Sequence, residues 1–447
     1  MADKQATTQR DGFKSKWGFI LACIGSAVGM GNIWRFPIMV SIWGGMTFLI
    51  PYFICVILIG STGVIGEFAL GRATGAGPIG AFGKCTELRG NRKIGEGIGL
   101  IPVIGSMALA IGYTVVMGWI FKYTFISITG DMHAMGQDMA SIGGHFDVVA
   151  VNNVPCIIVA ILASFAIMAL GVSGGIEKAN KIMMPALFVL FVVLGVYIAF
   201  LPGSGAGYKY IFTLDPKGLL NPLVWIFAFG QAFFSLSVTG SGMIVYGAYL
   251  SKDEDVVGVA QHTAFFDTIA AVVAALVIIP ACFSYGLDVG AGPSLLFVTL
   301  PTILQDIPMG QLFAIILYMA MIFAGVSSLQ NMFEVVAESL MHKFPKLNRV
   351  TVLVLLGALC LGFGIGMETI SKWGPWMDLV SIYIIPIGAT LGAVSWFYVM
   401  KKDALLDAIN TGSTKKRGDL WYNVGRYVYV PLAIILCCVA LFMHVAF

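Results

Sequence analysis

Two apolar stretches of the sequence are interrupted near their middle by glycines and by side chains that carry oxygen. The first interruption is GSAVGMGN (25–32), which ends on Asn32, and the second is FFSLSVTGSGM (233–243), which contains Ser235 and Ser237. A helix in lipid satisfies its own backbone groups, so weakening it in mid-membrane calls for a functional reason. Interrupted segments in corresponding halves of a chain predict a transporter that binds its solute and ions at the breaks. Close helix packing is the alternative, because small residues are also common where membrane helices touch.

The elements that must position these residues are membrane helices. Of the 447 residues, 58% are hydrophobic and 11% are charged, and the mean hydropathy is +0.91, whereas a soluble domain carries about 25% charged residues. Apolar runs long enough to cross ~30 Å of hydrocarbon recur along the chain. They predict eleven spans, at 17–41, 44–71, 95–125, 154–172, 178–201, 221–249, 259–284, 311–342, 350–367, 375–400 and 423–445. We therefore expect an all-α polytopic protein of the plasma membrane, with one domain (1–447) in the lipid bilayer.

Basic residues predict the orientation of these spans. Lys and Arg gather in 1–16 and in alternate loops, while the loops 126–153, 203–219 and 285–310 contain few of them. By the positive-inside rule, the N-terminus and the basic loops are cytoplasmic, and an odd number of spans places the C-terminus outside. The segment 292–310 is broken by prolines and predicts a helical hairpin over the outer face. Nucleic-acid binding is not expected, because each basic cluster is short and lies beside a span.

Several motifs, in order along the chain, carry a family resemblance. They are RDGFKSKWGFILACIGSAVGMGNIWRFP, GEFALGR, GQAFFSLS, SKDEDVV, GPSLLFVTLPTIL and AGVSS. The sequence resembles the neurotransmitter:sodium symporter family, and within it the bacterial amino-acid transporters with eleven helices. The resemblance covers nearly the whole chain. It implies a LeuT-like fold of two inverted five-helix repeats (17–201 and 221–400) with an eleventh helix (423–445), and sodium-coupled import of an amino acid.

The resemblance also implies two sodium sites at the first break. Unwinding frees backbone carbonyls, which suit Na⁺ because hard cations prefer oxygen ligands, and Gly29 and Gly31 let the first span open. The first site would combine the substrate's carboxylate with Ala27, Asn32, Ser235 and Asp267. The second would combine the carbonyls of Gly25, Val28 and Ala324 with the hydroxyls of Ser327 and Ser328. For these two hydroxyls, the alternative is a hydrogen bond back to their own helix.

By the same resemblance, the substrate is a neutral amino acid. Relatives that carry monoamines have an aspartate where this chain has Gly29, so the substrate here is expected to bring its own carboxylate. Tyr113 matches the tyrosine that binds this carboxylate and Phe234 matches an aromatic lid, although core packing is the alternative for each. Gly240 replaces a bulky residue of the relatives, which predicts a deep pocket for a hydrophobic or aromatic L-amino acid. The residues expected to bind the substrate are Ala27, Gly29, Gly31, Leu109, Tyr113, Phe234, Ser237, Gly240, Ser328, Asn331 and Met332.

An inner gate is implied near the N-terminus. Arg10 and Phe13 match the family's gating residues on the cytoplasmic side. The usual acidic partner is missing, because His342 occupies its place near the end of span eight. Glu338 lies one turn earlier on the same face and is the expected substitute.

Other intramembrane residues match further parts of the family's mechanism. Arg35 and Asp378 match the outer gate pair, and Glu67 matches the acid that bonds the unwound backbone of span six. Gly175 and Pro185 bracket nine residues that unwind in relatives, which would open a water path to the second sodium site. Proline disrupts the preceding turn and glycine adds flexibility, but an ordinary helix start with a proline kink is the alternative.

Asp267 also bears on chloride. Chloride-dependent relatives have asparagine at this position and serine where this chain has Ala271. A fixed carboxylate here supplies the negative charge that chloride supplies in those relatives. Transport without chloride is therefore expected. Once Na⁺ leaves, burial favours the neutral form of a carboxyl group, so proton counter-movement is expected on the return step.

Three other functions compete with transport. A channel would need a continuous polar pore, whereas the polar residues gather at one mid-membrane locus. An enzyme would need a nucleophile with a base or a metal cluster, and His262 and Asp267 are too far round a helix to share a face. No enzymatic activity is expected. A sensor that binds an amino acid without moving it stays open at this point.

Overall fold

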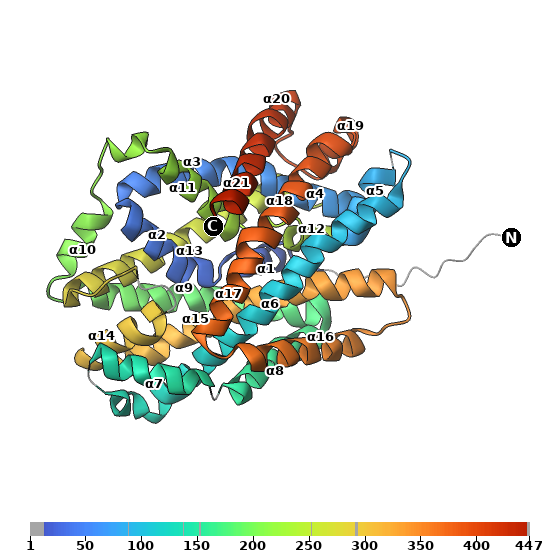
Figure 1. Cartoon of the computed structure of the whole chain (residues 1–447). Helices are drawn as coiled ribbons and strands as arrows, with labels where there is room; N and C mark the ends of the chain where they lie inside the picture. The colour runs from blue at the N-terminus through green and yellow to red at the C-terminus, as the bar shows by residue number, and fades with distance from the viewer. Residues whose placement is uncertain are drawn as a thin grey trace.

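The computed structural model describes residues 13–87, 89–136, 138–151, 153–251, 253–290 and 294–444, without the side chains of residues 133 and 134. Within this part of the chain, all regular structure is helical (Figure 1). Long helices cross the molecule, and short ones lie at its two ends. In Figure 1, α10 (Ser204–Ile211) and α14 (Leu300–Asp306) lie at the left-hand end, and α5 (Pro78–Glu87) and α19 (Lys402–Asn410) lie at the right-hand end.

Eight helices in the described residues are long and apolar enough to cross a membrane. Three of them are uninterrupted: α6 (Arg92–Thr129), α13 (Val256–Tyr285) and α15 (Gly310–Lys343). Each of the other five includes at least one 3₁₀- or π-helical turn. They are α3 (Met46–Ile59) with α4 (Ile65–Thr74), α9 (Glu177–Ala199), α16 (Arg349–Gly364), α17 (Ile370–Asp378) with α18 (Ile385–Val394), and α20 (Asp419–Val424) with α21 (Val430–Met443). Together they coincide with eight of the eleven predicted spans.

Short 3₁₀- and π-helical turns connect or extend these helices. The π-helical turns are η1 (Gly31–Arg35), η2 (Gly60–Val64), η4 (Val172–Ile176), η6 (Leu295–Thr299), η8 (Leu379–Ile384), η9 (Ser395–Val399) and η10 (Gly425–Tyr429). The 3₁₀ turns are η3 (Asp131–Met135), η5 (Gly218–Leu220) and η7 (Ile365–Met367). Several of them fall beside the functional residues described below.

Two further helix pairs are sharply bent. The first pair, α1 (Lys16–Ala27) and Gly31–Trp43, which includes α2 (Phe36–Trp43), is bent by 56° at the predicted break in span one. The second pair, α7 (Met139–Val151) and α8 (Val154–Ala169), is bent by 68°. The sixth predicted span is broken as well, into α11 (Pro222–Ser235) and α12 (Gly242–Ala248). Each half of span six is too short to cross alone, so the count of eleven spans stays a prediction.

The backbone explains both breaks. Helix α1 ends because Val28 adopts an extended conformation (ψ 110°), and the next amide, Gly29 N, donates to the side chain of Asn32 at 3.0 Å. After α11, Ser237 and Gly240 both have positive φ angles, 52° and 73°, which no helix continues through. The two interruptions read in the sequence are therefore real breaks.

The predicted hairpin at 292–310 differs from what is observed. Its described residues form one short helix, η6 and α14, and α7 packs against it although 126–153 was expected to be a loop. Pro301 lies inside this continuous helix and has no N–H to donate, and the carbonyl oxygens of Leu296 and Phe297 in the preceding turn accept from the hydroxyls of Tyr318 and Tyr123 at 2.8 and 2.9 Å. The described part of this segment thus contributes one helix rather than two to this end of the molecule.

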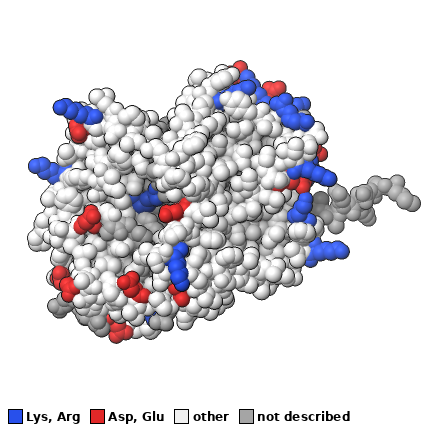
Figure 2. Space-filling model, in the orientation of Figure 1, with Lys and Arg blue, Asp and Glu red and all other residues white. Residues whose placement is uncertain are grey.

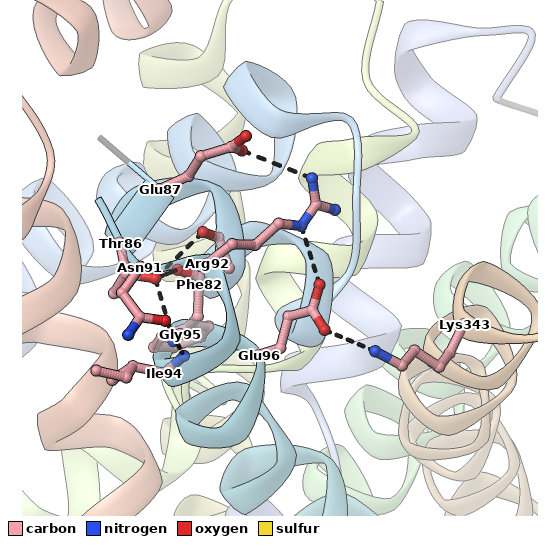
Figure 3. A network of polar contacts seen from close by, with 10 residues as sticks. Phe82, Thr86, Glu87, Asn91, Arg92, Ile94, Gly95, Glu96 and Lys343 are labelled. Atoms are coloured by element: carbon pink, nitrogen blue, oxygen red, sulfur yellow. Dashed lines mark hydrogen bonds and ion pairs between the residues drawn. The ribbon is translucent and has the colours of Figure 1, made fainter. Parts of the chain in front are cut away.

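Charge is distributed unevenly along the molecule. Figure 2 shows Lys and Arg gathered along the upper right and right-hand edge of this face, where α5 and α19 lie, and fewer charges in the band between the ends. Ion pairs join helices at the basic end (Figure 3): Glu96 of α6 accepts from Arg92 at 2.9 Å and from Lys343, at the end of α15, at 2.6 Å. Arg92 also lies 3.6 Å from Glu87 of α5. These contacts tie α5, α6 and α15 together outside the apolar band.

Candidate functional site

The break in α1 and the break between α11 and α12 border one cavity of about 50 Å³. Its lining also includes residues of α6 and α15. The lining residues are Ser26, Ala27, Gly29, Gly31, Asn32, Ser106, Leu109, Tyr113, Phe234, Ser235, Ser237, Thr239, Ser241, Ser328, Asn331 and Met332. All of the residues predicted to bind substrate are among them except Gly240.

Asn32, Ser235 and Asp267 meet beside this cavity, all buried. The Asn32 side-chain amide donates to Asp267 Oδ1 at 2.7 Å and to Ser235 Oγ at 3.1 Å. The Ser235 hydroxyl in turn donates to Asp267 Oδ2 at 2.7 Å. Three segments far apart in the sequence, η1, α11 and α13, thus place one carboxylate, one hydroxyl and one amide together, with Ala27 on the wall of the adjoining cavity.

The residues predicted for the second sodium site also gather, between α1 and α15. Ser328 Oγ lies 3.4 Å from the Gly25 carbonyl oxygen and 3.3 Å from that of Val28. The Ser327 hydroxyl donates to the Ala324 carbonyl at 2.9 Å. Ser327 therefore makes the bond to its own helix that the sequence left as an alternative, whereas Ser328 reaches across to the broken helix.

Tyr113 and Phe234 both lie close to the unwound segment. The Tyr113 hydroxyl accepts a hydrogen bond from the Met30 amide at 2.8 Å. A Cβ on Gly29 would stand 2.7 Å from both this hydroxyl and Ser328 Oγ, and one on Gly31 would stand 2.7 Å from the Phe234 ring. A side chain at position 29 would thus fill the space beside the two hydroxyls, and one at position 31 would press against the Phe234 ring.

Three hydroxyls outside the predicted set of residues form a polar patch in the same cavity. Ser106 Oγ donates to Ser241 Oγ at 3.0 Å, and Thr239 Oγ1 lies 2.7 Å from Ser241 Oγ. Ser106 precedes Tyr113 by seven residues, so it lies on the same face of α6 about 10 Å away. Leu109 lies between them on that face. The position of Ser106 in the cavity could have been predicted from its helical spacing to Leu109 and Tyr113. The sequence does not indicate which side chains of the 236–241 loop face the cavity.

Gly240 does not line the cavity, and the expectation that it deepens the pocket is wrong. Its amide donates to Glu67 Oε1 at 2.7 Å, and its Cβ position points at the Gly388 carbonyl oxygen, 2.6 Å away, on α18. With φ at 73°, residue 240 also occupies a conformation that other residues rarely adopt. Glu67 does bond the unwound backbone of span six, as its matched role implies.

The residues predicted to form the outer gate line a second, larger cavity of about 350 Å³. Arg35 and Asp378 both border it, together with Phe234 and Tyr113. The Arg35 guanidinium carbon lies 5.9 Å from the centre of the Phe234 ring, a cation–π geometry. Phe234 borders both cavities, as do Gly31 and Tyr113.

Only some of the residues predicted to form an inner gate lie within the described part of the chain. Arg10 lies outside the described residues. The Phe13 ring packs edge-on against Phe19 and Tyr246, with centroids 5.0 and 5.7 Å apart. Glu338 is buried and accepts from the Gly77 amide at 2.8 Å. Its role as the acidic partner of the inner gate stays a prediction.

Gly175 and Pro185 both lie in helical backbone, in η4 and α9. A Cβ on Gly175 would stand 1.9 Å from the Ile167 carbonyl oxygen, whereas one on Gly174 would meet nothing within 4 Å. Gly175 is therefore required for packing against α8, and Gly174 is the position where backbone stiffness alone can be changed. Unwinding of this segment stays a prediction.

Gly174→Ala tests whether the segment unwinds during transport. Alanine favours helix over glycine by up to about 1 kcal/mol, so we expect turnover to fall by about two- to fivefold with substrate affinity unchanged. Transport rates and equilibrium binding of the purified protein would measure the two effects separately. Weaker binding with an unaltered rate would contradict unwinding. Gly175→Ala serves as the contrast, because its methyl group should reduce stability as well.

Similarity to known proteins covers nearly the whole chain. The model of the sodium:neurotransmitter symporter family matches residues 10–138 and 133–446. The chain belongs to the sodium:neurotransmitter symporter family. A sodium-dependent transporter of Bacillus subtilis, YhdH, is 32% identical over 440 residues, covering 94% of this chain and 95% of the relative. A sodium-dependent transporter of Methanocaldococcus jannaschii is 32% identical over 436 residues, covering 92% and 87%.

A solved structure shows the same fold. The crystal structure of MhsT in complex with L-phenylalanine has a TM-score of 0.85 and 31% identity, and the match covers 96% of this chain and 100% of that chain. This symporter therefore has the LeuT-like fold expected from its motifs. It is a sodium-dependent, multi-span membrane transporter.

Proposed function

We propose that the protein imports a neutral aromatic L-amino acid together with Na⁺ by alternating access. The observation that supports this most is the meeting of two helix breaks around one cavity with oxygen-bearing side chains on its walls. Such breaks at mid-membrane bind substrate and coupling ions in secondary transporters. The outer cavity, which reaches Phe234, is the proposed entry path.

Two sodium ions are proposed. At the first site, Asp267 supplies a charge, and Asn32, Ser235 and the Ala27 carbonyl supply neutral oxygens, joined by the substrate's carboxylate. At the second site, all ligands are neutral: Gly25, Val28, Ala324, Ser327 and Ser328. The contacts among these residues support the assignment, because hard cations prefer such oxygens.

The substrate's carboxylate is proposed to lie between Tyr113 and the amides around Gly29. Freed amides at a helix break favour an anion, and Gly29 leaves no room for an acid of the protein's own. The substrate's side chain would extend along α6 past Leu109 toward the polar patch of Ser106, Thr239 and Ser241. MhsT, which was solved with L-phenylalanine, supports an aromatic amino acid, and the hydroxyls favour one with a polar atom at its tip, such as tyrosine or tryptophan.

Chloride independence with proton return is also proposed. Asp267 is fully buried on α13 and Ala271, one turn later, has no hydroxyl to complete an anion site. The carboxylate balances the sodium charge without chloride. On the empty return step, a proton is the available counter-charge.

The basic end of the molecule is proposed to face the cytoplasm, in the plasma membrane. The clustering of Lys and Arg supports this orientation. The C-terminus would then lie outside. Residues 17–201 and 221–400 are proposed as the two inverted repeats.

Reconstitution tests the proposed function against its rivals. In proteoliposomes, labelled tyrosine or phenylalanine should accumulate when Na⁺ is outside, and uptake should be electrogenic. Each charge that crosses 100 mV contributes about 2.3 kcal/mol. Equal uptake from K⁺ and Na⁺ media would overturn sodium coupling. Counterflow of labelled substrate distinguishes a carrier from a channel, a sensor or an enzyme.

A stability series tests the substrate class. With Na⁺ present, tyrosine and tryptophan should raise the unfolding temperature of the purified protein more than phenylalanine or leucine. One hydrogen bond to the hydroxyl patch is worth about 1 kcal/mol, or roughly fivefold in affinity. Ser106→Ala should remove the advantage of tyrosine and leave phenylalanine binding unchanged. A response limited to amines, glutamate or lysine would refute the assignment.

A further inference from the structure

A buried asparagine on α9 carries an oxygen that nothing in the described residues satisfies. Asn180 has 0% of its side chain exposed. Its Nδ2 donates to the Ile176 carbonyl at 2.9 Å and to Gln330 Oε1 at 3.3 Å. Its Oδ1 has no hydrogen-bond partner within the part of the chain that the structure describes. Because both acceptors face the nitrogen, the amide cannot be turned round without losing both bonds.

The orphan oxygen points at the broken helix. A Cβ on Gly25 would stand 2.2 Å from Asn180 Oδ1 and 2.9 Å from Ser327 Cβ. The oxygen and Ser327 are therefore neighbours across Gly25, at the junction of α1, α9 and α15. Only a glycine at position 25 leaves this approach open.

This junction is where the second sodium ion is proposed to bind. Its other proposed oxygens are the carbonyls of Gly25, Val28 and Ala324 and the hydroxyls of Ser327 and Ser328, and all of them are neutral. A buried, unpaired amide oxygen is costly in a protein interior, and a hard cation or its bound water supplies the missing positive partner.

We propose that Asn180 belongs to the second sodium site, where its Oδ1 holds the ion directly or through one bound water. The inference rests on the proposed function, and it adds a ligand from α9 to a site otherwise built from α1 and α15. Gln330 positions the amide through its own Oε1.

The position of Asn180 links ion binding to the movement of α9. It lies between Gly175 and Pro185, in the segment that is expected to unwind. Unwinding would carry the oxygen away from Gly25 and leave the ion with fewer ligands. Release of this ion and opening of the inner path would then be one event.

Sodium titrations of the purified protein test the proposal. Asn180→Ala should raise the Na⁺ concentration for half-maximal thermal stabilisation, and for half-maximal ²²Na⁺ binding, by about 10-fold or more, the loss typical of a supporting ligand contact. Substrate affinity at saturating Na⁺ should stay within about twofold of the wild type.

A matched control is available at Asn153, at the start of α8. Its side chain is also fully buried, donates to a carbonyl (Val115, 3.0 Å) and leaves Oδ1 without a partner in the described residues. Asn153→Ala should lower overall stability without moving the sodium midpoint. An unchanged sodium midpoint in Asn180→Ala would overturn the proposal.

Asn180→Asp keeps the test decisive if the alanine variant does not fold. A carboxylate at this position should lower the sodium midpoint, whereas a purely structural asparagine predicts no change and would refute a ligand role. If the wild type itself shows no response to Na⁺, the proposed function fails, and the role of Asn180 fails with it.

Discussion

Replacing Asp267 by asparagine is expected to abolish Na⁺-driven uptake in chloride-free medium. The carboxylate is fully buried and is held by Asn32 and Ser235, each at 2.7 Å. The substitution keeps the shape and removes the only protein charge proposed for the first sodium ion. Removing one partner of a buried charge pair costs about 3–5 kcal/mol, which is more than about 100-fold in affinity.

Asp255→Asn is the matched control, because it makes the same change on the same helix away from the cavity. Asp255 caps α13 by accepting from the Gly258 amide at 3.0 Å, and asparagine caps a helix as well. Uptake of labelled substrate with gluconate in place of chloride would measure both variants. Normal uptake by Asp267→Asn, or collapse of wild-type uptake in gluconate, would contradict the proposed role of this carboxylate.

The second large effect is expected on stability, from Arg349→Met. Arg349, at the start of α16, bonds both carboxylate oxygens of Glu334 at 3.1 and 2.5 Å. Glu334 is fully buried on α15, and the Tyr249 hydroxyl donates to it at 2.7 Å. Methionine would leave this carboxylate without its cation, at a cost of about 3–5 kcal/mol. The lower end is expected, because 20% of the Arg349 side chain is exposed to solvent.

Thermal unfolding in detergent would measure this loss of stability. Two further variants serve as controls. The double variant Arg349→Met with Glu334→Gln should recover much of the stability, since no buried charge is left unpaired. Lys343→Met breaks the exposed pair with Glu96, in which 52% of the lysine side chain is exposed, and should cost less than about 1 kcal/mol. Equal losses from Arg349→Met and Lys343→Met would show that burial of Glu334 does not decide the effect.

The two breaks and most of the cavity lining could be predicted because they depend on local chemistry. Glycine next to polar residues in an apolar run marks a weak helix, and the motifs around Asn32 and Ser328 fix which family the breaks belong to. Helical spacing then places Leu109 and Tyr113 on one face of α6. These features need no knowledge of how distant segments pack.

Other parts of the site depend on packing that the sequence does not reveal. Gly240 points away from the cavity because positive φ angles at 237 and 240 turn the loop, which brings Thr239 and Ser241 inward. Asn180 Oδ1 lies beside Gly25 because α9 packs there, although the two residues are 155 positions apart in the sequence. The pairing of Glu334 with Arg349 likewise depends on the packing of α16 against α15.

The hydroxyl of Ser328 lines the substrate cavity and also contacts the Gly25 and Val28 carbonyls. In the proposed assignment, one side chain therefore belongs to both the substrate site and an ion site. Thermodynamic linkage then requires reciprocity: the factor by which Na⁺ strengthens substrate binding equals the factor by which substrate strengthens Na⁺ binding. In a compartment poor in sodium, loss of the ion would by itself loosen the hold on the substrate. The sodium gradient alone would then set the direction of net transport. No separate signal would be needed for substrate release on the sodium-poor side.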